Sequence, residues 1–444
     1  MKNICVRFVL FLFTSVALAQ STHVSILNND KGIKLVVNGK DFMINGMNWD
    51  YFPIGTNYSY SLWQQSDAFI KEALDAEMSL LKNMGVNAIR VYSGIQPKWV
   101  QYIYENYGIY TMLNHSFGRY GVGINGDWVP VTDYSDTAAQ DQLLSEVTLM
   151  AEDYKNTPGL LLYLLGNENN YGLFWAGAET EDFPDNEHEK QFVGENRGRP
   201  MYKLMNTAAV KMKSINSSVP VAICNGDVLF IDIIADECKD VDIFGVNMYR
   251  GISFGDAFQV VKDKLNKPIL FTEFGADAFN TIQNKEDQQS QAYYNLGNWK
   301  EIYQNASGLG KTGNAIGGFT FQFSDGWWKF GQTKNLDIHD NHASWSNGAY
   351  QFDYKEGENN MNEEWFGICA KGPTNDKGFY ESYPRAAYYA LKEAHKINPF
   401  SEGITLEYID KAFKNININK AVSKALKNKK TLQTKQSDCV KKGK

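Results

Sequence analysis

Two glutamates lie at positions where a carboxylate needs a specific role. Glu168 ends the apolar run 164–168, and Glu273 lies within a second apolar run, residues 269–275. Removing a carboxylate from water at the end of a buried strand is costly, so such a group is usually partnered or functional. Two carboxyl groups on one scaffold can cleave a glycosidic bond, one as acid and the other as nucleophile or base. The fold must bring the two together for this chemistry to occur.

The rest of the chain alternates between strand-like and helix-like patterns, which is typical of a parallel α/β fold. Eight apolar segments are expected to be strands: residues 42–48, 88–92, 110–113, 161–166, 221–224, 243–247, 268–273 and 318–323. Amphipathic segments lie between most of them, and the clearest are residues 67–84, 137–154, 287–304 and 384–397. No glycine-rich phosphate loop follows the first strand, which argues against an open doubly wound sheet. We therefore expect a single (β/α)8 TIM barrel over residues 20–400.

On this barrel, Glu168 ends the fourth strand and Glu273 ends the seventh. All barrel strands run parallel, so both carboxylates are expected at the C-terminal rim, where barrel enzymes carry their active sites. Long loops after the fourth and eighth strands, residues 169–200 and 324–376, are rich in aromatic residues, Asn and Asp. These loops are expected to wall the site.

A retaining mechanism places the two carboxyl groups roughly 5–5.5 Å apart. We predict Glu273 as the nucleophile and Glu168 as the acid/base, with Asn167 bonding the sugar 2-hydroxyl. The negative charge of Glu273 is expected to raise the pKa of Glu168, so that Glu168 can protonate the leaving oxygen. Loss of that charge in the glycosyl ester would lower the pKa again, and Glu168 could then deprotonate water or a sugar acceptor.

Other residues near the predicted strand ends suit supporting roles. Arg90 would direct a permanent cation toward Glu273, and a structural ion pair is the alternative. Tyr249 could donate its hydroxyl to the nucleophile, whereas a lone tyrosine is more often a packing residue. Trp327 and Trp328, expected to end the eighth strand, could form a floor for a sugar ring.

Weaker candidates complete the predicted site. Asn247, at the end of the sixth strand, and His115 and Arg119, after the third, are candidate substrate-binding residues. His339 and His342 lie in a loop rich in Asp and Asn, for which a solvated loop is favoured over metal ligation. No metal and no cofactor are predicted.

The N-terminus reads as a processing signal. Lys2 and Arg7 precede the apolar segment 8–18, and the small residues that follow predict cleavage after Ala19. No later segment approaches the roughly 18 apolar residues that span a bilayer. We expect a signal peptide at residues 1–19 and a secreted, periplasmic or extracellular protein.

Cleavage would leave four cysteines without metal-type spacing: Cys224, Cys238, Cys369 and Cys439. Cys224 lies in an apolar run and is expected to be a small core residue. Export would permit a bridge between Cys224 and Cys238, which the sequence does not itself indicate.

Charge is unevenly distributed along the chain. The formal net charge is −7, yet from Lys411 onward there are eleven lysines and one acid, Asp438. The acidic body argues against nucleic acid as a partner. The lysine-rich C-terminal extension, residues 401–444, could contact an anionic cell envelope, although a solvated, partly helical or disordered extension is favoured.

The two glutamate motifs carry a family resemblance. Gly166-Asn167-Glu168 and the segment 272–275, Thr-Glu-Phe-Gly, resemble the retaining β-glycoside hydrolases of clan A, the 4/7 superfamily. The segments 42–49 and 87–90 are most similar to the first two strands of the family 2 barrel, and the resemblance covers residues 32–397. It implies Glu168 as acid/base, Glu273 as nucleophile, and Asn167, Arg90 and Tyr249 as supporting residues.

The resemblance also has departures. Family 2 enzymes usually carry β-sandwich domains ahead of the barrel, and we expect none ahead of this one, because too few residues precede it. A barrel-only architecture also resembles the family 5 endo-glycanases and the fungal β-1,3-glucanosyltransferases, which share an Arg-Val-Tyr second strand and a Gly-Asn-Glu fourth strand.

The expected function is a secreted retaining β-glycoside hydrolase that acts on an oligo- or polysaccharide. A β-glucan or β-mannan is favoured over a galactoside or glucuronide. Two alternatives stay open: a transglycosylase that uses the same residues with a sugar acceptor, and a non-catalytic glycan-binding barrel. The intact glutamate pair argues against the last, because a binding module has no need of it.

Overall fold

The computed structural model describes residues 21–92, 94–175, 186–329 and 331–442, with side chains described as far as residue 430. The predicted signal peptide, residues 1–19, lies outside the described residues.

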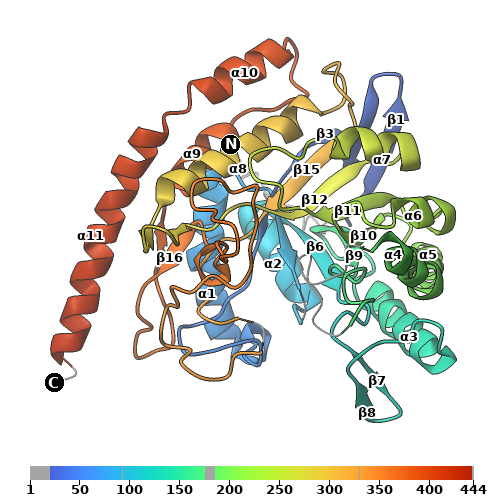
Figure 1. The fold of residues 1–444 in the computed structure, drawn as a ribbon, viewed down its shortest axis with the longest axis horizontal. Helices are drawn as coiled ribbons and strands as arrows, with labels where there is room; N and C mark the ends of the chain where they lie inside the picture. The colour runs from blue at the N-terminus through green and yellow to red at the C-terminus, as the bar shows by residue number, and fades with distance from the viewer. Residues whose placement is uncertain (1–20, 93, 176–185, 330, 443–444) are drawn as a thin grey trace, which may run out of the picture.

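Eight parallel strands close into a barrel, which confirms the predicted fold (Figure 1). In barrel order they are β4 (Ile44–Asn48), β5 (Ala88–Val91), β6 (Tyr110–His115), β9 (Leu160–Leu165), β10 (Val221–Gly226), β11 (Ile243–Asn247), β12 (Ile269–Phe274) and β15 (Ala315–Thr320). The last strand pairs with the first, with Gly317 opposite Ile44. All eight predicted strands exist, with ends shifted by a few residues.

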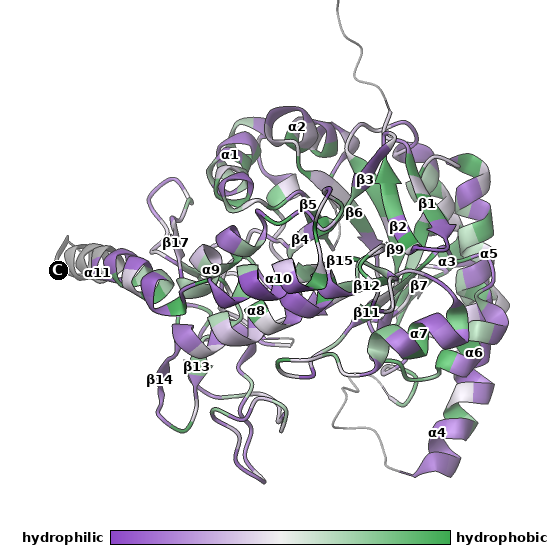
Figure 2. Ribbon diagram, turned by 90° about the horizontal axis from the view of Figure 1, so that it is seen from above, coloured by the Kyte–Doolittle hydropathy of each residue, from purple (hydrophilic) through white to green (hydrophobic). Residues whose placement is uncertain are grey.

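Helices surround the barrel on its outer side. They are α1 (Asp67–Met84), α2 (Pro97–Tyr107), α3 (Thr137–Asp153), α4 (Glu187–Val193), α5 (Arg199–Ile215), α6 (Ile231–Glu237), α7 (Ala257–Leu265), α8 (Gln288–Gln304) and α9 (Ala386–Ala394). Local chemistry sets their ends, as α1 illustrates: the Ser66 side chain accepts from the Phe69 amide, and Gly85 takes a left-handed φ of 91°. Figure 2 shows hydrophilic residues on the outward faces of α6 and α7.

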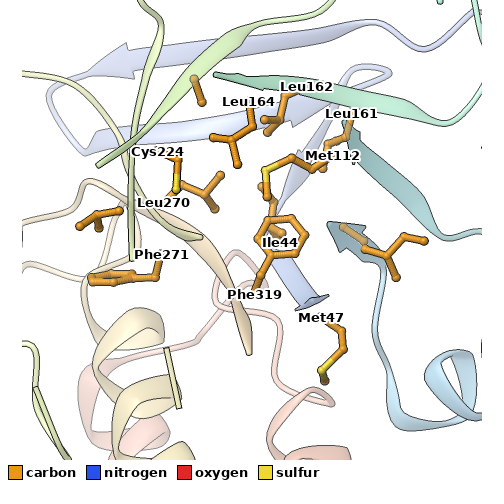
Figure 3. Close-up of a cluster of buried hydrophobic side chains, with 14 of the residues drawn as sticks. Ile44, Met47, Met112, Leu161, Leu162, Leu164, Cys224, Leu270, Phe271 and Phe319 are labelled. Atoms are coloured by element: carbon orange, nitrogen blue, oxygen red, sulfur yellow. The ribbon is translucent and has the colours of Figure 1, made fainter. Parts of the chain in front are cut away.

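Apolar side chains of the barrel strands form a continuous buried core. Figure 3 labels ten of them: Ile44, Met47, Met112, Leu161, Leu162, Leu164, Cys224, Leu270, Phe271 and Phe319. Each large apolar side chain buried here contributes about 1.5–3 kcal/mol relative to exposure. Cys224 and Cys238 are both buried and free, so the bridge between them is not formed. The side chain of Cys439 lies outside the described ones.

The first and the eighth predicted strands differ from expectation in ways that matter for the site. An antiparallel sheet of β1 (Val24–Asn29), β2 (Gly32–Val37) and β3 (Lys40–Phe42) precedes the barrel, so Phe42 belongs to β3 and not to the first barrel strand. The amide of Ile33 donates to the Gly313 carbonyl, which attaches this sheet beside the start of β15. The eighth strand ends at Thr320, because the aromatic-rich residues 321–323 leave the barrel.

Short elements lie in the loops between strands and helices. The loop after β6 forms a hairpin of β7 (Val122–Ile124) and β8 (Asp127–Val129). A second hairpin, β13 (Phe279–Asn280) with β14 (Lys285–Glu286), follows β12. The long segment after β15 contains the 3₁₀ helix η3 (Glu363–Trp365) and the paired strands β16 (Cys369–Lys371) and β17 (Ser382–Pro384).

The C-terminal extension is helical. It consists of α10 (Leu406–Lys414) and α11 (Ile418–Lys442), and α11 begins against α8, α9 and β17 before it projects past the barrel (Figures 1 and 2). Ala421 and Ala425 are buried, and the Asn428 amide donates to the Pro384 carbonyl and to the Tyr389 hydroxyl, both at 2.9 Å. The described side chains of α11 therefore anchor it to the barrel. Within the described part of the chain, no helix is both long and apolar enough to cross a membrane.

Candidate active site

Glu273 lies near the C-terminal end of β12 and is buried. Its Oε1 accepts hydrogen bonds from Arg90 Nη1 and from the Tyr92 hydroxyl, each at 2.8 Å. Its Oε2 accepts from the Tyr249 hydroxyl at 3.0 Å. Donors from β5, from just after β5 and from just after β11 therefore fix both carboxylate oxygens, as a nucleophile requires.

Arg90 joins the two predicted catalytic strands. Its side chain is fully buried, and besides Glu273 it donates through Nη2 to Asn114 Oδ1 at 2.6 Å and to Asn167 Oδ1 at 2.8 Å. Burial alone would lower the pKa of Arg90, but Tyr92, Cys224 and Glu273 raise it above its ordinary value, so the guanidinium stays charged. Arg90 was predicted either to direct its cation toward Glu273 or to form a structural ion pair. Both descriptions apply, because its ion pair is formed with Glu273, the predicted nucleophile.

Asn167 and Glu168 follow β9 on a tight turn. Gly166 has a φ of 87°, and a Cβ there would lie 2.6 Å from Asn169 Oδ1, the atom that accepts from the Asn167 amide. Glu168 itself has a left-handed φ of 57°, which is uncommon for a residue with a side chain. Backbone bonds from the Glu168 amide to Cys224 and from the Tyr171 amide to the Glu168 carbonyl hold it there. An uncommon backbone conformation at a strand end is typical of functional sites.

Asn167 connects to both sides of the barrel mouth. Its Oδ1 also accepts from Asn247 Nδ2 at 3.1 Å, and its Nδ2 donates to the Tyr120 hydroxyl at 2.8 Å. Asn247 Oδ1 in turn accepts from the Thr272 hydroxyl at 2.7 Å. The structure thus brings Arg90, Asn167, Asn247 and Tyr249 into one network with Glu273.

The tyrosines around Glu273 are donors. Burial, reinforced by the charge of Glu273, raises the pKa of both Tyr92 and Tyr249 well above the ordinary value of 10. Each hydroxyl therefore keeps its proton at neutral pH. The ring of Tyr249 packs edge-on against Trp345 and Phe366 of the long loop after β15, with centroids 5.7 and 5.8 Å apart.

Several residues of this site were not predicted. Asn48 Oδ1 lies 2.9 Å from the Tyr92 hydroxyl, whose single proton it shares with Glu273. Asn48 is the last residue of β4, and Asn114 lies near the end of β6. Glu273 was identified by its position at the end of a predicted strand, and the same signal would have identified Asn48 and Asn114. Trp345 and Glu363 lie in the long loop, where no periodic pattern marks them.

Glu363, the first residue of η3, interacts electrostatically with Glu273. Burial raises its pKa, the charge of Glu273 raises it further, and Lys329 and a hydrogen bond with Ser344 oppose the increase.

Three sequence candidates make contacts with residues outside the Glu273 network. His115 Nδ1 accepts from the Phe117 amide at 3.1 Å, so Nε2 carries the proton and faces Glu146 of α3 at 3.1 Å. Trp327 and Trp328 lie beyond the end of β15, contrary to expectation, because that strand ends at Thr320. Trp328 packs near Phe52, with ring centroids 5.3 Å apart.

The solvated-loop prediction is wrong for His339. Its ring lies between Trp327, at a centroid distance of 4.8 Å, and Trp365, at 4.0 Å, and burial lowers its pKa. His342 is exposed and contacts Asp340 at 2.7 Å. Among the described side chains, no three His, Cys, Asp or Glu residues are grouped so that they could hold a metal ion. Arg119 lies over the Tyr120 ring, 5.7 Å from its centroid.

A second buried arginine lies outside the barrel mouth. Arg385 binds Asp325 through Nη1 at 2.5 Å and Nη2 at 2.7 Å, and it binds Glu286 through Nε at 2.8 Å. Lys429 of α11 contacts the other oxygen of Glu286 at 2.6 Å. This cluster ties the start of the long loop to the hairpin after β12 and to the C-terminal helix.

Comparisons with known proteins find relatives among enzymes that act on glycans. Residues 30–307 match the family described as "Glycosyl hydrolases family 2, TIM barrel domain". The probable 1,3-beta-glucanosyltransferase GAS3 of Saccharomyces cerevisiae is 25% identical over 284 residues, which cover 58% of this chain and 50% of that protein. This chain therefore spans half of the length of that relative.

Two solved structures share the fold. Saccharomyces cerevisiae Gas2p in complex with laminaripentaose has 18% identity and a TM-score of 0.50, covering 87% of this chain and 71% of that one. The apo structure of Bacteroides uniformis beta-glucuronidase 3 has 16% identity and a TM-score of 0.50, covering 84% and 40%. At these identities the likeness concerns the barrel fold alone.

Proposed function

The chain belongs to the glycosyl hydrolases of family 2 through its TIM barrel, and from this premise we propose that it is a retaining β-glycoside hydrolase. Its substrate would be a β-linked oligo- or polysaccharide, with a β-glucan or β-mannan favoured. Glu273 is the nucleophile and Glu168 is the acid/base in this proposal. Asn167, Arg90, Asn247 and Tyr249 position the sugar and the nucleophile.

One observation carries the proposal. Glu273 is a buried carboxylate at a barrel rim, and three donors, Arg90, Tyr92 and Tyr249, hold its two oxygens. A purely structural ion pair has no need of two phenolic donors in addition to a guanidinium. Arg90 also contacts Asn167, which directly precedes Glu168, so one side chain positions both ends of the reaction centre.

In the first step, Glu273 attacks the anomeric carbon. Oε1 is held by two donors, so Oε2, which accepts only from Tyr249 among the bonds given above, forms the new C–O bond. The bond to the leaving oxygen breaks as Glu168 transfers its proton to that oxygen. The products of this step are a glycosyl ester on Glu273, an anionic Glu168 and a neutral leaving alcohol.

In the second step, Glu168 takes a proton from water and the water oxygen attacks the anomeric carbon. The ester bond breaks, Glu273 regains its negative charge, and the sugar is released with its original configuration. Tyr249 and Arg90 stabilise the carboxylate as its charge returns, because their donors already point at it.

A covalent label tests the nucleophile. A panel of 2-deoxy-2-fluoro β-glycosides with dinitrophenyl leaving groups is offered to the enzyme, and the labelled peptide is found by mass spectrometry. We expect one glycosyl group on the peptide that contains Glu273. Product configuration, followed by proton NMR, is expected to be retained, and an inverted first product would overturn the mechanism.

The acid/base has its own test. Glu168→Ala should slow substrates with poor leaving groups by about 10²–10⁴-fold, and activated aryl glycosides far less, because a good leaving group needs little protonation. Equal losses on both kinds of substrate would contradict the role.

Transglycosylation is a second candidate, which the match to GAS3, named as a probable 1,3-beta-glucanosyltransferase, favours. The residues and the first step are the same, and a sugar hydroxyl replaces water in the second step. Chain-length analysis separates the two activities, since a transferase makes products longer than its substrate.

Export and envelope contact form a further part of the proposal. The N-terminal pattern supports cleavage after Ala19, and the lysines of α11 support contact with an anionic cell envelope. Mass spectrometry of the mature N-terminus tests the first. Cosedimentation with vesicles containing anionic lipid, for the full chain and for a chain ending at residue 417, tests the second.

A further inference from the structure

We propose that the β7–β8 hairpin carries a binding platform for the leaving-group part of a β-glycan chain, with Trp128 as the ring on which a sugar stacks. This inference rests on the proposed function, since it names a substrate subsite of the same active centre. It implies that the substrate extends beyond the sugar whose bond is cleaved.

The hairpin lies at the end of the barrel that holds the glutamates. It follows β6 directly, and β6 runs parallel to β9 and pairs with it. Figure 1 shows β7 and β8 extending from the barrel at the end opposite β1 and β3. The hairpin therefore borders the mouth beside Glu168.

Trp128 presents its indole to solvent. It is 64% exposed, and its position in β8 opposite Gly123 places no side chain across the strand pair from it. A Cβ at Gly121 would lie 2.7 Å from the indole Cζ2, so the ring rests against the backbone of that glycine. One side of the indole is supported, and the other is available to a flat partner.

Three tryptophans in the long segment after β15 are held differently. Trp327 stacks on His339, Trp328 packs near Phe52, and Trp345 packs near Tyr249, each with ring centroids less than 6 Å apart. Each of those rings therefore has an aromatic neighbour within the protein. An indole left largely in water on a two-stranded hairpin is instead suited to stacking on a sugar, whose C–H face is apolar.

A chain of contacts connects Trp128 to the acid/base. Tyr120, 46% exposed, directly precedes Gly121, and its hydroxyl accepts from Asn167 Nδ2 at 2.8 Å. Burial of that hydroxyl raises the pKa of Tyr120 to about 12, so it remains protonated. Asn167 adjoins Glu168, which gives its proton to the leaving oxygen. Residues that continue outward from Glu168 therefore meet the leaving part of the glycan and not the sugar bound to Glu273.

The test compares two substrate lengths in Trp128→Ala. The probes are laminaripentaose, cellopentaose and mannopentaose, each paired with the 4-nitrophenyl β-glycoside of its own sugar. For the pentasaccharide that the native enzyme cleaves best, we expect the ratio of its kcat/KM to that of the aryl glycoside to fall about five- to tenfold in Trp128→Ala. Trp128→Phe should recover most of the ratio, because a smaller aromatic ring remains.

Tyr408→Ala is the matched control. Tyr408 is 50% exposed on α10, away from the mouth, and its loss should leave the ratio unchanged. A ratio unchanged in Trp128→Ala, or one that falls equally in the Tyr408 variant, overturns the platform while the proposed function stands. If the native enzyme cleaves none of the six probes, the proposed function itself fails, and the platform fails with it.

Discussion

Two buried arginines, Arg90 and Arg385, have opposite kinds of surroundings. Arg90, 0% exposed, has one carboxylate partner, Glu273, and its other acceptors are neutral, chiefly the amide oxygens of Asn114 and Asn167. Arg385, 2% exposed, has two carboxylates, Asp325 and Glu286. Arg90 therefore faces a single negative charge, whereas Arg385 faces two.

The difference follows from what each carboxylate must do. In the proposed reaction, the charge of Glu273 disappears when the glycosyl ester forms, and Arg90 then has only neutral acceptors and the substrate. A second carboxylate on Arg90 would compete with Glu273 for the same donors and would stay charged throughout. Arg385 has no such cycle, so its charges can be permanently balanced. Buried charge serves reactivity in the first cluster and attachment of loops and helices in the second.

The largest expected effect comes from neutralising the reactive carboxylate. Glu273→Gln keeps the side-chain shape and should reduce kcat by about 10⁴-fold or more, because no nucleophile remains. The free energy of unfolding should change much less than for loss of a carboxylate from the Arg385 cluster, since Asn114 and Asn167 still satisfy Arg90. Kinetics on an activated aryl glycoside and urea unfolding measure the two quantities, and residual activity above about 1% would contradict the comparison.

Removing a carboxylate from the second cluster should produce the reverse outcome. Asp325→Ala is expected to lower the free energy of unfolding by about 3–5 kcal/mol, because the bidentate partner of a buried guanidinium is lost. Below the unfolding transition, kcat should stay within about tenfold of the native value. Urea unfolding followed by tryptophan fluorescence gives the first number. If Asp325→Ala lost as much activity as Glu273→Gln while its free energy of unfolding stayed unchanged, the Arg385 cluster would not have the structural role described here.

The next largest effect concerns the pH dependence of the free energy of unfolding, to which Glu286 of the Arg385 cluster contributes. Burial alone would raise the pKa of Glu286, but Arg385 and Lys429 lower it from 4.5 to about 2. The depressed pKa means that its stabilisation, about 3 kcal/mol, is complete above pH 4.5 and is lost as pH falls from there toward 2. Glu286→Gln should lose this part of the pH dependence of unfolding. An unchanged acid slope in that variant would remove Glu286 as its source.

The smallest effect concerns the C-terminal helix. Lys429 is partly exposed, so Lys429→Ala should lower the free energy of unfolding by about 1 kcal/mol or less. The effect should shrink in 1 M salt, because screening weakens a partly exposed pair. Lys420→Ala, on the same helix but exposed, serves as the control and should have no measurable effect. A large loss for Lys429→Ala would mean that α11 is an integral part of the second cluster.

The fold and the centre of the site could be predicted because each has a periodic or positional signal. Apolar runs separated by amphipathic segments gave eight barrel strands, and their C-terminal ends gave Glu168 and Glu273. The orientation of Arg90 toward Glu273 followed from the same rule. The role of Tyr249 was left open in the sequence analysis. Tyr249 lies beyond the end of β11, so strand alternation does not predict the direction of its hydroxyl.

The remainder depends on tertiary contacts that no local pattern encodes. His339 looks solvated in an Asp- and Asn-rich loop, yet two tryptophans enclose it. Phe321 and Phe323 have strong strand preference and nevertheless lie outside the sheet, while the glycine-containing segment Ala315–Thr320 forms β15. The neighbouring strand explains the glycine at position 317, because a Cβ there would lie 2.2 Å from the Ile44 carbonyl oxygen of β4.

The pairing of β15 with β4 joins the last barrel strand to be translated to the first. The strand 44–48 emerges from the ribosome early, but its second neighbour, residues 315–320, is translated roughly 10–50 s later at about 5–20 residues per second. Through that interval the nascent sheet has two open edges, and edges of this kind recruit other strands. Closing a barrel between its first and last strands also raises contact order, which slows folding. The two edges can pair with each other only after the eighth strand has been made.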